Sequence, residues 1–394
     1  MSIVDTFNPT PEHLSLRKTV RDFVEREVEP QAAETDRLEK FNMPLFRKLA
    51  DLGLLGLTVP KHYGGLGMDA SAAVIVHEEL ATSDSGFTLA YLTHSMLFAE
   101  NLARNGSEEQ CRRFLPDACA GKIIGCMAMS EPGAGTDLMG MTTRALCENG
   151  QYILNGSKMW ITNGVIGDGE MGDVFLIYAR TSEHSVRGIS LLLVEKGTPG
   201  FSLGRRIRSK LGVRGSTSTE LLLQDCPVPE GNRVGPEGTA VLRMMRTLEI
   251  ERLTMAAMGL GIAKRALEIM NRFATERRAF GQPIRTFGQI QRHLGESYAE
   301  FMAGRAYVYQ TASMIDRGVG GVALDADGVK LYCSTMAKNV ADRAIQVLGA
   351  RGYIGENVVE RLWRDAKLLE IGGGTLEAHQ RNITRNLVRV GRIE

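Results

Sequence analysis

The segment from Gln151 to Gly164 reads QYILNGSKMWITNG and marks a change in the spacing of apolar residues along the chain. It places Asn155-Gly156 between two β-prone runs, and this dipeptide is the strongest short-range signal for a hairpin. We therefore predict a hairpin turn at Asn155-Gly156. Three more strand-like runs follow between Gly, Pro and Asp residues: DVFLIYAR, GISLLLVEKG and TELLLQDCPVP. Together these runs predict a compact β domain.

Helical patterns lie on both sides of this β region. The first third has apolar residues at helical spacing, for example Leu16, Val20, Phe23, Val24 and Val28. After Gly238 the helical period returns and continues to the end of the chain. We therefore expect an α+β protein with an N-terminal helical domain at 1–121, a middle β domain at 122–237 and a C-terminal helical domain at 238–394.

Composition excludes several classes of protein. The 394 residues are 43% hydrophobic and 24% charged, with a formal net charge of +1, so neither nucleic acid nor an acidic membrane is an expected partner. No apolar run approaches the 18 residues of a membrane span, and the first residues lack the pattern of a signal peptide. The six cysteines form no CxxC pair and the seven histidines complete no metal pattern. We expect no metal, reduced and buried cysteines, and a cytoplasmic location.

The helix that begins near Thr239 carries a glutamate on an apolar face. The face consists of Met244, Leu248, Met255, Met258 and Ile262, and Glu251 lies on it, whereas Glu249 lies on another face. A buried ionised carboxylate is costly, so Glu251 either pairs with an arginine of another helix or has a raised pKa. In the second case it is a candidate catalytic base.

Near the C-terminus, LLEIGGGTLE at Leu368–Glu377 places three glycines between two helical patterns. Each glycine costs about 0.8–1.0 kcal/mol in a helix interior relative to alanine, so a bare backbone must serve a purpose there. Thr375 is suited to cap the following helix, whose apolar face carries Leu376, His379, Ile383 and Leu387. The segments EPGAGTD, WITNG and ERRAFGQP are each too weak to assign a site alone.

Taken together and in this order, six segments resemble the signature sequences of the acyl-CoA dehydrogenase family. They read MAMSEPGAGTD, YILNGSKMWITNG, KLGVRGSTSTEL, ERRAFGQPI, QVLGARGYI and LWRDAKLLEIGGGT, and they cover almost the whole chain. The resemblance implies two helical domains around a β-barrel-like middle domain, with a four-helix bundle at the C-terminus, usually in a homotetramer. It also implies bound FAD, removal of the α and β hydrogens of an acyl-CoA thioester, and an electron-transferring flavoprotein as electron acceptor.

The resemblance also implies the catalytic residues. Many members carry the catalytic glutamate just before the Gly-Thr of the last segment, where this chain has Gly373. A subset resembling isovaleryl-CoA dehydrogenase has a small residue there and a base in a sequence like LDLER. The sequence here is LEIER, which assigns the base to Glu251. The N–H of Gly373 is then expected to bond the thioester oxygen, with Gly374 beside the substrate.

Further residues are assigned by the same resemblance. Those expected to contact FAD within the chain are Met127, Met129, Ser130, Trp160, Thr162, Thr375 and Glu377. Those expected to contact the FAD of a neighbouring subunit are Arg277, Phe280, Gln346, Val347, Gly349 and Ala350. Thr136 and Arg252 match positions near the thioester and the CoA moiety. One departure is FGQIQ, which has Gly288 where members commonly have a glutamine, so either Gln289 replaces that contact or it is lost.

Several alternatives remain at this stage. A missing side chain at residue 373 beside a methionine-rich face suggests a short or branched, β-methyl acyl group. The same fold and base would serve an acyl or aminoacyl thioester held on a carrier protein. A flavin monooxygenase on this fold would not need Glu251, and an acyl-CoA oxidase would usually carry a further C-terminal domain. A catalytically silent binding subunit would be expected to lack both glutamates.

Overall fold

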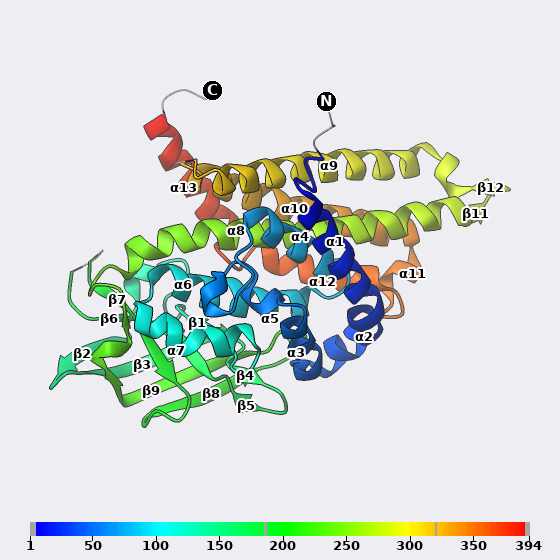
Figure 1. Cartoon of the computed structure of the whole chain (residues 1–394). Coiled ribbons are helices and arrows are strands. Elements are labelled where there is room, and N and C mark those ends of the chain that lie inside the picture. Colours follow the sequence, from blue (N-terminus) through cyan, green and yellow to red (C-terminus); the bar gives the residue numbers. More distant parts are fainter. Residues whose placement is uncertain (1–4, 185–186, 320, 391–394) are drawn as a thin grey trace.

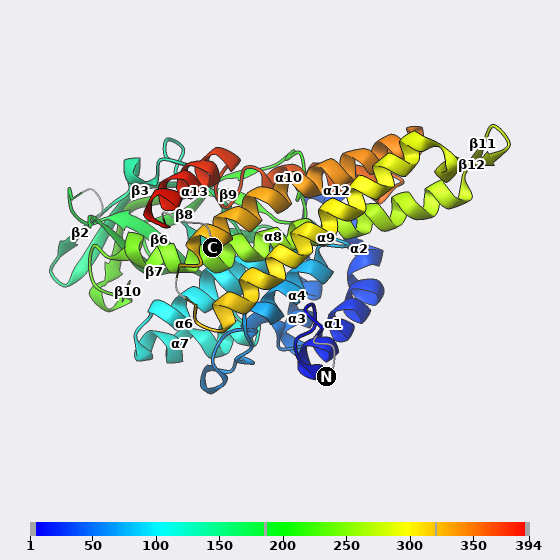
Figure 2. The same ribbon diagram turned by 90° about the horizontal axis from the view of Figure 1, so that it is seen from above.

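The computed structural model describes residues 5–184, 187–319 and 321–390, so the outermost residues of the first and last predicted domains lie outside it. It has three regions (Figure 1): a group of N-terminal helices, a β-sheet region, and a set of long C-terminal helices. Figure 2 shows the N-terminal helices along one side of the long helices and the sheet at one end of them. This arrangement confirms the predicted order of helices, strands and helices.

The N-terminal region consists of short helices, most of which begin at a polar capping residue. Thr10, Asn42, Asp69, Asp84 and Ser107 each accept a backbone N–H from the first turn of the helix that follows. The helices are α1 (Pro11–Phe23), the π-helix η1 (Val24–Val28), α2 (Glu29–Leu38), α3 (Met43–Asp51), α4 (Ala70–Leu80), α5 (Ser85–Leu92), the π-helix η4 (Thr93–Glu100), α6 (Asn101–Asn105) and α7 (Glu108–Cys119). Short 3₁₀ turns, η2 (Leu54–Gly56) and η3 (Lys61–Tyr63), connect α3 to α4.

The middle region is one mainly antiparallel sheet in the order β10-β7-β6-β2-β3-β9-β8, with β1 added parallel to β6. Its strands are β1 (Gly125–Ala128), β2 (Arg144–Glu148), β3 (Gln151–Thr162), β6 (Val174–Arg180), β7 (Ile189–Glu195), β8 (Phe201–Ile207), β9 (Ser218–Pro229) and β10 (Arg233–Val234). The short strands β4 (Val165–Ile166) and β5 (Glu170–Met171) form a separate pair. One core cluster contains residues of β1, β2, β3, β6, β7, β8 and β9, so the sheet encloses apolar residues of its own.

The predicted hairpin turn at Asn155-Gly156 is wrong. β3 runs unbroken from Gln151 to Thr162, and the turn that joins it to β2 lies at Asn149-Gly150, with φ of 51° and 78°. Gly156 instead marks an irregularity where β3 pairs with β9. A Cβ on Gly156 would lie 2.7 Å from the Cα of Thr143, so glycine is required for a close backbone approach.

The C-terminal region is a bundle of long helices. It contains α8 (Ala240–Glu276), α9 (Gly288–Asp316), α10 (Ala323–Leu348), α11 (Ala350–Tyr353), α12 (Val358–Leu369) and α13 (Leu376–Val390). The small hairpin of β11 (Arg278–Ala279) and β12 (Gln282–Pro283), followed by the 3₁₀ turn η7 (Ile284–Thr286), joins α8 to α9. Figure 2 shows this hairpin projecting from one end of the bundle, on the side away from the sheet.

The largest apolar core lies around α8. It joins the buried residues of α4 and α5 to those of α8, α10 and α12, and it includes Met255, Met258 and Ile262. A second cluster lies between α7, η4, the start of α8 and strands β6 and β7, and includes Met244. The methionine-rich face of α8 is therefore buried, as the periodicity predicted.

Three expectations from composition can be compared with the described residues. No helix among them is long and apolar enough to cross a membrane, and no cluster of three or more His, Cys, Asp or Glu side chains could hold a metal. All six cysteines are free. The expectation that they are all buried is wrong for Cys147, which lies exposed on β2 because that strand presents every side chain except Ala145 to solvent.

Candidate active site

The buried face of α8 places Glu251 inside the protein, with only 7% of its surface exposed. Burial raises the pKa of Glu251, and the nearby charges of Arg252 and Lys330 oppose part of this rise. Among the side chains that the structure describes, no lysine or arginine lies within 4 Å of the carboxylate as an ion pair. The pairing with an arginine of another helix is therefore not observed, and Glu251 has the surroundings of a general base.

The glycine segment between α12 and α13 forms a tight loop next to Glu251. Gly373 and Gly374 have φ of 63° and 100°, which side-chain-bearing residues rarely adopt. A Cβ on Gly373 would lie 3.4 Å from Oε1 of Glu251 and 2.3 Å from Sδ of Met255. The fold therefore brings Glu251 and Gly373 together, and Met255 takes the space that a side chain at residue 373 would need.

The backbone of this loop leaves N–H donors available, and that of Gly373 is one of them. Ile371 and Gly372 donate their N–H groups to the carbonyl of Leu368, and Leu376 donates to Glu370. In the part of the chain that is described, no acceptor takes the N–H of Gly373. A free N–H beside a buried carboxylate is the arrangement needed to hold a carbonyl oxygen while a neighbouring proton is removed.

Thr375 caps α13 as predicted. Its hydroxyl accepts the N–H of Ala378 at 3.2 Å. Glu377 lies exposed in the first turn, where its own backbone N–H and the hydroxyl of Thr375 lower the pKa of its carboxyl. Both residues are thus at the N-terminal end of a helix, which favours negatively charged ligand groups. Their assignment to the cofactor stays a prediction.

A buried ion pair holds the segment with Met127, Met129 and Ser130 against β3. Lys158 on β3 lies 2.8 Å from the carboxylate of Glu131 and also donates to the carbonyl of Met129. Burial acts to raise the pKa of Glu131, but the charge of Lys158 and the backbone N–H of Thr142 lower it to about 2. The N–H of Met159 donates to the carbonyl of Ser130 at 2.9 Å. These bonds bring the predicted cofactor residues of two segments together.

Trp160 has the surroundings expected beside a planar ligand. It lies at an irregularity of β3 with φ of 67°, a rare conformation for a bulky residue, and 59% of its surface is exposed. Such strain is concentrated at ligand sites. Thr162 is half-buried two residues further on the same strand. Met127 packs against both core clusters that contain the methionines of α8. The residues present therefore fit a flavin ring.

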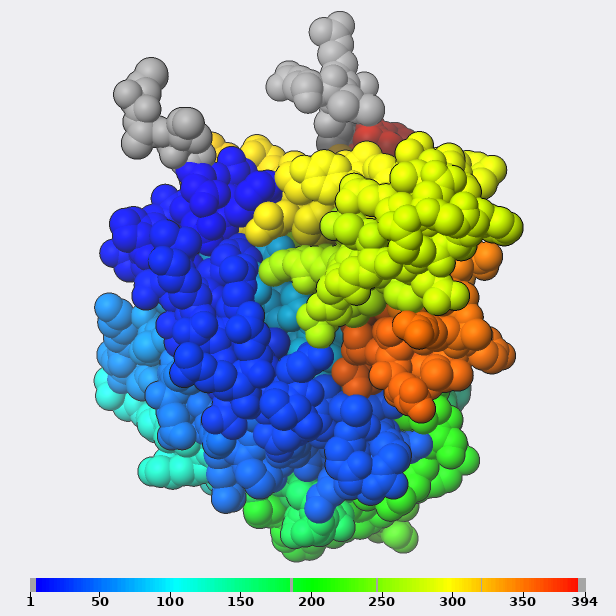
Figure 3. All heavy atoms as spheres, turned by 90° about the vertical axis from the view of Figure 1, so that its right-hand side faces the viewer, coloured from blue at the N-terminus to red at the C-terminus, as the bar shows by residue number. Residues whose placement is uncertain are grey.

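The other predicted cofactor residues lie at the hairpin end of the bundle. Figure 3 shows the hairpin end of α8 and α9 and the segment around α11 on the same face of the molecule. Phe280 is 95% exposed with φ of 51°, and Arg277, Gln346, Gly349 and Ala350 are exposed as well. Val347 differs because its side chain is buried in the core. Figure 1 places this hairpin at the end of the bundle remote from the sheet, so one chain does not join these residues to Trp160.

The two predicted CoA-side residues differ in their surroundings. Thr136 is exposed in the loop after Glu131. Arg252 is buried, and its Nη1 lies 3.2 Å from Oδ1 of Asp327 on α10. Gly288 opens α9, and Gln289 after it is exposed. Their roles toward a ligand stay predictions.

Three buried polar residues near the glycine loop were not predicted. Asp327 and Lys330 lie one turn apart on α10, and His379 lies on α13. The sequence does hold a signal for Asp327 and Lys330. These two charged residues lie three positions apart on a helical face that also carries the apolar Ala326, Val329 and Cys333. His379 had been placed on the apolar face of its helix, but its partner lies 52 residues away in sequence.

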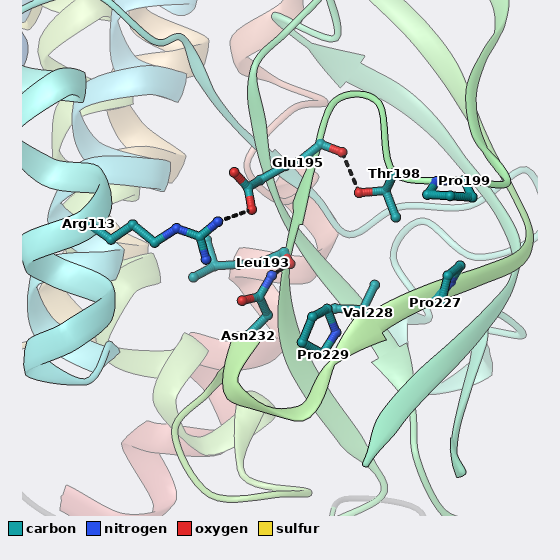
Figure 4. A pocket seen from close by; sticks show the side chains of 9 residues that line it. All are labelled: Arg113, Leu193, Glu195, Thr198, Pro199, Pro227, Val228, Pro229 and Asn232. Carbon is teal, nitrogen blue, oxygen red and sulfur yellow. Dashed lines mark hydrogen bonds and ion pairs between the residues drawn. The ribbon is translucent and has the colours of Figure 1, made fainter. Parts of the chain in front are cut away.

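A separate hollow lies between α7 and the sheet (Figure 4). It is lined by Arg113, Leu193, Glu195, Thr198, Pro199, Pro227, Val228, Pro229 and Asn232. Arg113 donates to Glu195 at 2.6 Å across its edge. None of the described residues assigned above to substrate or cofactor lines this hollow, so it is not part of the candidate active site.

Comparison with known proteins is consistent with this geometry over the whole chain. Three family models match in order: acyl-CoA dehydrogenase N-terminal domain at residues 10–122, middle domain at 126–226 and C-terminal domain at 238–388. A mitochondrial isovaleryl-CoA dehydrogenase of Pongo abelii is 40% identical over 95% of this chain and 88% of its own length.

Solved structures show the same similarity. Butyryl-CoA dehydrogenase of Megasphaera elsdenii superposes with a TM-score of 0.92 at 32% identity, covering 99% of this chain and 100% of that one. A prolyl acyl carrier protein oxidase superposes with a TM-score of 0.91 at 31% identity, covering 96% and 99%. The fold and the site thus define an oxidoreductase of the flavin-linked class. The chain belongs to the acyl-CoA dehydrogenase family.

Proposed function

We propose that this protein is an FAD-dependent dehydrogenase that converts a short or branched acyl-CoA thioester to the corresponding 2-enoyl-CoA, with Glu251 as the α-proton base. The observation that carries the proposal is the contact between the buried carboxylate of Glu251 and the site of the absent side chain at Gly373, 3.4 Å apart. It explains how a member without a glutamate at residue 373 still has a base beside the glycine loop.

The chain supplies binding, orientation and a proton acceptor. The free N–H of Gly373 bonds the thioester carbonyl and stabilises negative charge on that oxygen when the α proton leaves. Glu251 takes this proton, and its burial in an apolar face makes the carboxylate a stronger base than an exposed one. FAD, when bound, supplies the acceptor for the β hydrogen as hydride. The apolar walls around Met255 exclude water from the reacting carbons.

The proposed cofactor residues come from two parts of the chain. Within one subunit, FAD is held beside Met127, Met129, Ser130, Trp160 and Thr162, with Thr375 and Glu377 near its polar portion. The exposed residues at the hairpin end, Arg277 and Phe280 with Gln346, Gly349 and Ala350, reach the FAD of a neighbouring subunit. The 95% exposure of Phe280 supports this, because its ring meets Phe287 edge-on and still leaves most of its surface open to another subunit. The proposal therefore includes a homotetramer.

The acyl group is proposed to be short or branched near the β carbon. Met255 occupies part of the space at Gly373, so less space remains for the acyl chain beyond the reacting carbons. The relatives reported above act, by their names, on isovaleryl-CoA and butyryl-CoA. An electron-transferring flavoprotein is the proposed acceptor on family grounds, and Thr136 and Arg252 are proposed CoA-side contacts. The cytoplasmic location stays a prediction.

The test is anaerobic bleaching of the bound flavin by straight and branched acyl-CoA thioesters, in the wild type and in Glu251→Gln. We expect branched or short thioesters to bleach the wild type and not the variant, although the variant still binds the thioester. Glu268→Gln, an exposed glutamate on the same helix, serves as the matched control and should bleach normally. Equal bleaching of Glu251→Gln and wild type would place the base elsewhere, and protein that retains no flavin would support a silent binding subunit.

A second candidate substrate is an acyl or aminoacyl group attached to a carrier protein. The similarity to a prolyl acyl carrier protein oxidase favours it, because the same fold is used there. The carrier-bound thioester is then tested beside the free CoA thioester at equal concentration. Bleaching by the carrier-bound form alone would replace CoA by a carrier protein in the proposal.

A further inference from the structure

The glycine loop is held at its start by Lys330 of α10 and at its end by His379 of α13, whose ring is bonded in turn to Asp327 of α10. At its start, Nζ of Lys330 donates to the carbonyl of Leu369, the last residue of α12. At its end, Nε2 of His379 lies 3.1 Å from the carbonyl oxygen of Gly374. Nδ1 of the same ring lies 2.6 Å from Oδ1 of Asp327. We call Asp327, Lys330 and His379 the loop clamp.

The geometry of the clamp is specific to glycine at residue 374. A Cβ there would lie 2.9 Å from Nε2 and Cε1 of His379, so the ring packs directly on the bare backbone. Asp327 and Lys330 lie three residues apart on α10 and therefore face the loop from one side of a 26-residue helix. A long packed helix is a rigid support for both contacts. The free N–H of Gly373 lies between the two held carbonyls.

Several ionisable groups meet at the clamp. The ring of His379 bridges the carbonyl of Gly374 and the carboxyl group of Asp327 through its two nitrogens. Nη1 of Arg252 lies 3.2 Å from Oδ1 of Asp327, and the amide of Asn382 lies 3.4 Å from the same oxygen. Arg252 and Lys330 are the two cations whose charges act on Glu251. Glu251, Asp327 and Glu370 are the acidic groups of the same region.

Such a cluster is not explained by stability alone. Asp327, Lys330 and His379 are all buried, and replacing buried ion pairs by apolar side chains is often neutral or stabilising. The polar atoms converge on the two carbonyls that flank the N–H proposed to hold the thioester oxygen. The cations Arg252 and Lys330 beside Glu251 favour the negative charge that develops on that oxygen.

From these contacts we propose that Asp327, Lys330 and His379 are positioning residues for dehydrogenation. They hold the ends of the glycine loop so that the Gly373 N–H stays directed at the thioester oxygen and its distance to Glu251 is kept. The inference rests on the proposed function. It gives residues of α10 and α13 the role of positioning the glycine loop, a role that needs no contact with the substrate.

The test compares Asp327→Ala, Asp327→Asn and Lys330→Met with Asp325→Ala. Asp325 is two residues away on the same helix, and its carboxylate accepts from Tyr307 at 3.1 Å outside the clamp. Stopped-flow reduction of the flavin separates the rate constant of the chemical step from thioester binding. We expect Asp327→Ala and Lys330→Met to lose about tenfold to hundredfold in that rate constant, less than direct loss of an oxyanion donor costs. Binding of the thioester should change by less than about threefold, because a residue that acts only in the chemical step leaves the affinity for the bound substrate nearly unchanged.

A spectroscopic signal gives a readout that a purely structural role would not change. With the flavin reduced beforehand, the bound thioester does not react, and the infrared stretch of its ¹³C-labelled carbonyl reports the bond to Gly373. We expect Asp327→Ala to move this stretch toward its value in water, and Asp327→Asn to restore most of the wild-type position because its amide oxygen still accepts from His379. His379→Gln provides the same comparison if Asp327→Ala retains no flavin.

The outcomes separate the two proposals. Clamp variants that lower only the melting temperature, with rate constant and carbonyl stretch equal to those of Asp325→Ala, overturn the clamp while the proposed function stands. A wild-type flavin that no CoA or carrier-bound thioester reduces overturns the proposed function and the clamp's role with it. Slower reduction and a shifted carbonyl in the clamp variants alone support both.

Discussion

Glu251 lies within α8, and the β11–β12 hairpin follows the C-terminal end of the same helix. The two regions differ in burial and in the contacts that their side chains make. Around Glu251 the side chains are buried, charged groups contact one another, and the glycine loop is held at both ends. At the hairpin end Phe280 is 95% exposed, and Arg277 is exposed beside it. Both regions were predicted to contact ligands.

The contrast indicates where one chain suffices and where it does not. A buried carboxylate must find its surroundings within the fold, because leaving it without compensation costs several kcal/mol. An exposed aromatic residue carries no such constraint, so its partner can come from another subunit. The reacting centre is therefore expected to depend on contacts within the chain, and flavin retention on contacts between chains.

The largest expected effect concerns Glu251 itself. Glu251→Gln should lower the rate constant of flavin reduction by about a hundredfold to ten-thousandfold, since a general base contributes about 10²–10⁴. Rapid mixing with excess thioester under anaerobic conditions measures it, with Glu268→Gln as control. A loss smaller than tenfold would break the contrast, because the buried centre would then not contain the base.

Gly373→Ala should have the next largest effect. The added Cβ meets Sδ of Met255 and must adopt a φ of 63°, so we expect a loss of about tenfold to hundredfold in the same rate constant. Met255→Ala removes the steric conflict and leaves the backbone strain. The double variant should therefore recover part of the loss, and a double-mutant cycle measures this coupling. Strict additivity of the two changes would show that Met255 is not the obstacle.

At the hairpin end, Arg277→Ala should weaken flavin binding about tenfold, because a hydrogen bond to a charged group contributes about 1.5–3 kcal/mol. Its rate constant for flavin reduction should stay near that of wild type once the flavin is saturating. Phe280→Ser should shift the protein toward smaller species in sedimentation. Leu146→Ser, an exposed apolar residue on β2, is the control and should do neither. Unchanged flavin affinity and size in both hairpin variants would remove the need for a neighbouring subunit.

The smallest expected effect is on the pH profile. Burial raises the pKa of Glu251, and only the ionised form accepts a proton, so the rate constant should rise with pH through an inflection above the ordinary glutamate range. Lys330 and Arg252 hold this pKa down. Lys330→Met should therefore move the inflection upward, whereas Asp325→Ala should leave it in place. A downward shift in Lys330→Met would contradict the electrostatic surroundings described for the buried centre.

Much of the fold followed from local patterns. Apolar periodicity located the helical and β regions, and the methionine-rich face of α8 is buried as its spacing required. Thr375 caps α13 because its hydroxyl can accept a backbone N–H from the first turn of the apolar helical run that follows. Glu251 could be singled out because one carboxylate on an otherwise apolar face conflicts with its surroundings.

Other features could not be located in this way. Two Asn-Gly dipeptides lie six residues apart, and the turn formed at Asn149 while Asn155 became part of β3. Either dipeptide is a suitable turn, and the choice depends on the pairing of β3 with β2 and β9. Asp327 and His379 lie 52 residues apart, so no local pattern joins them.

Periodicity, capping and the glycine break were readable from the amino-acid order, because each depends on neighbours within a few residues. They established the order of helices and strands, the buried face of α8 and the glutamate on it. Only the tertiary structure decided that Met255 fills the space at Gly373, that α10 and α13 hold the glycine loop, and that Phe280 is left 95% exposed. These contacts depend on which faces of distant elements meet, and long-range packing determines that.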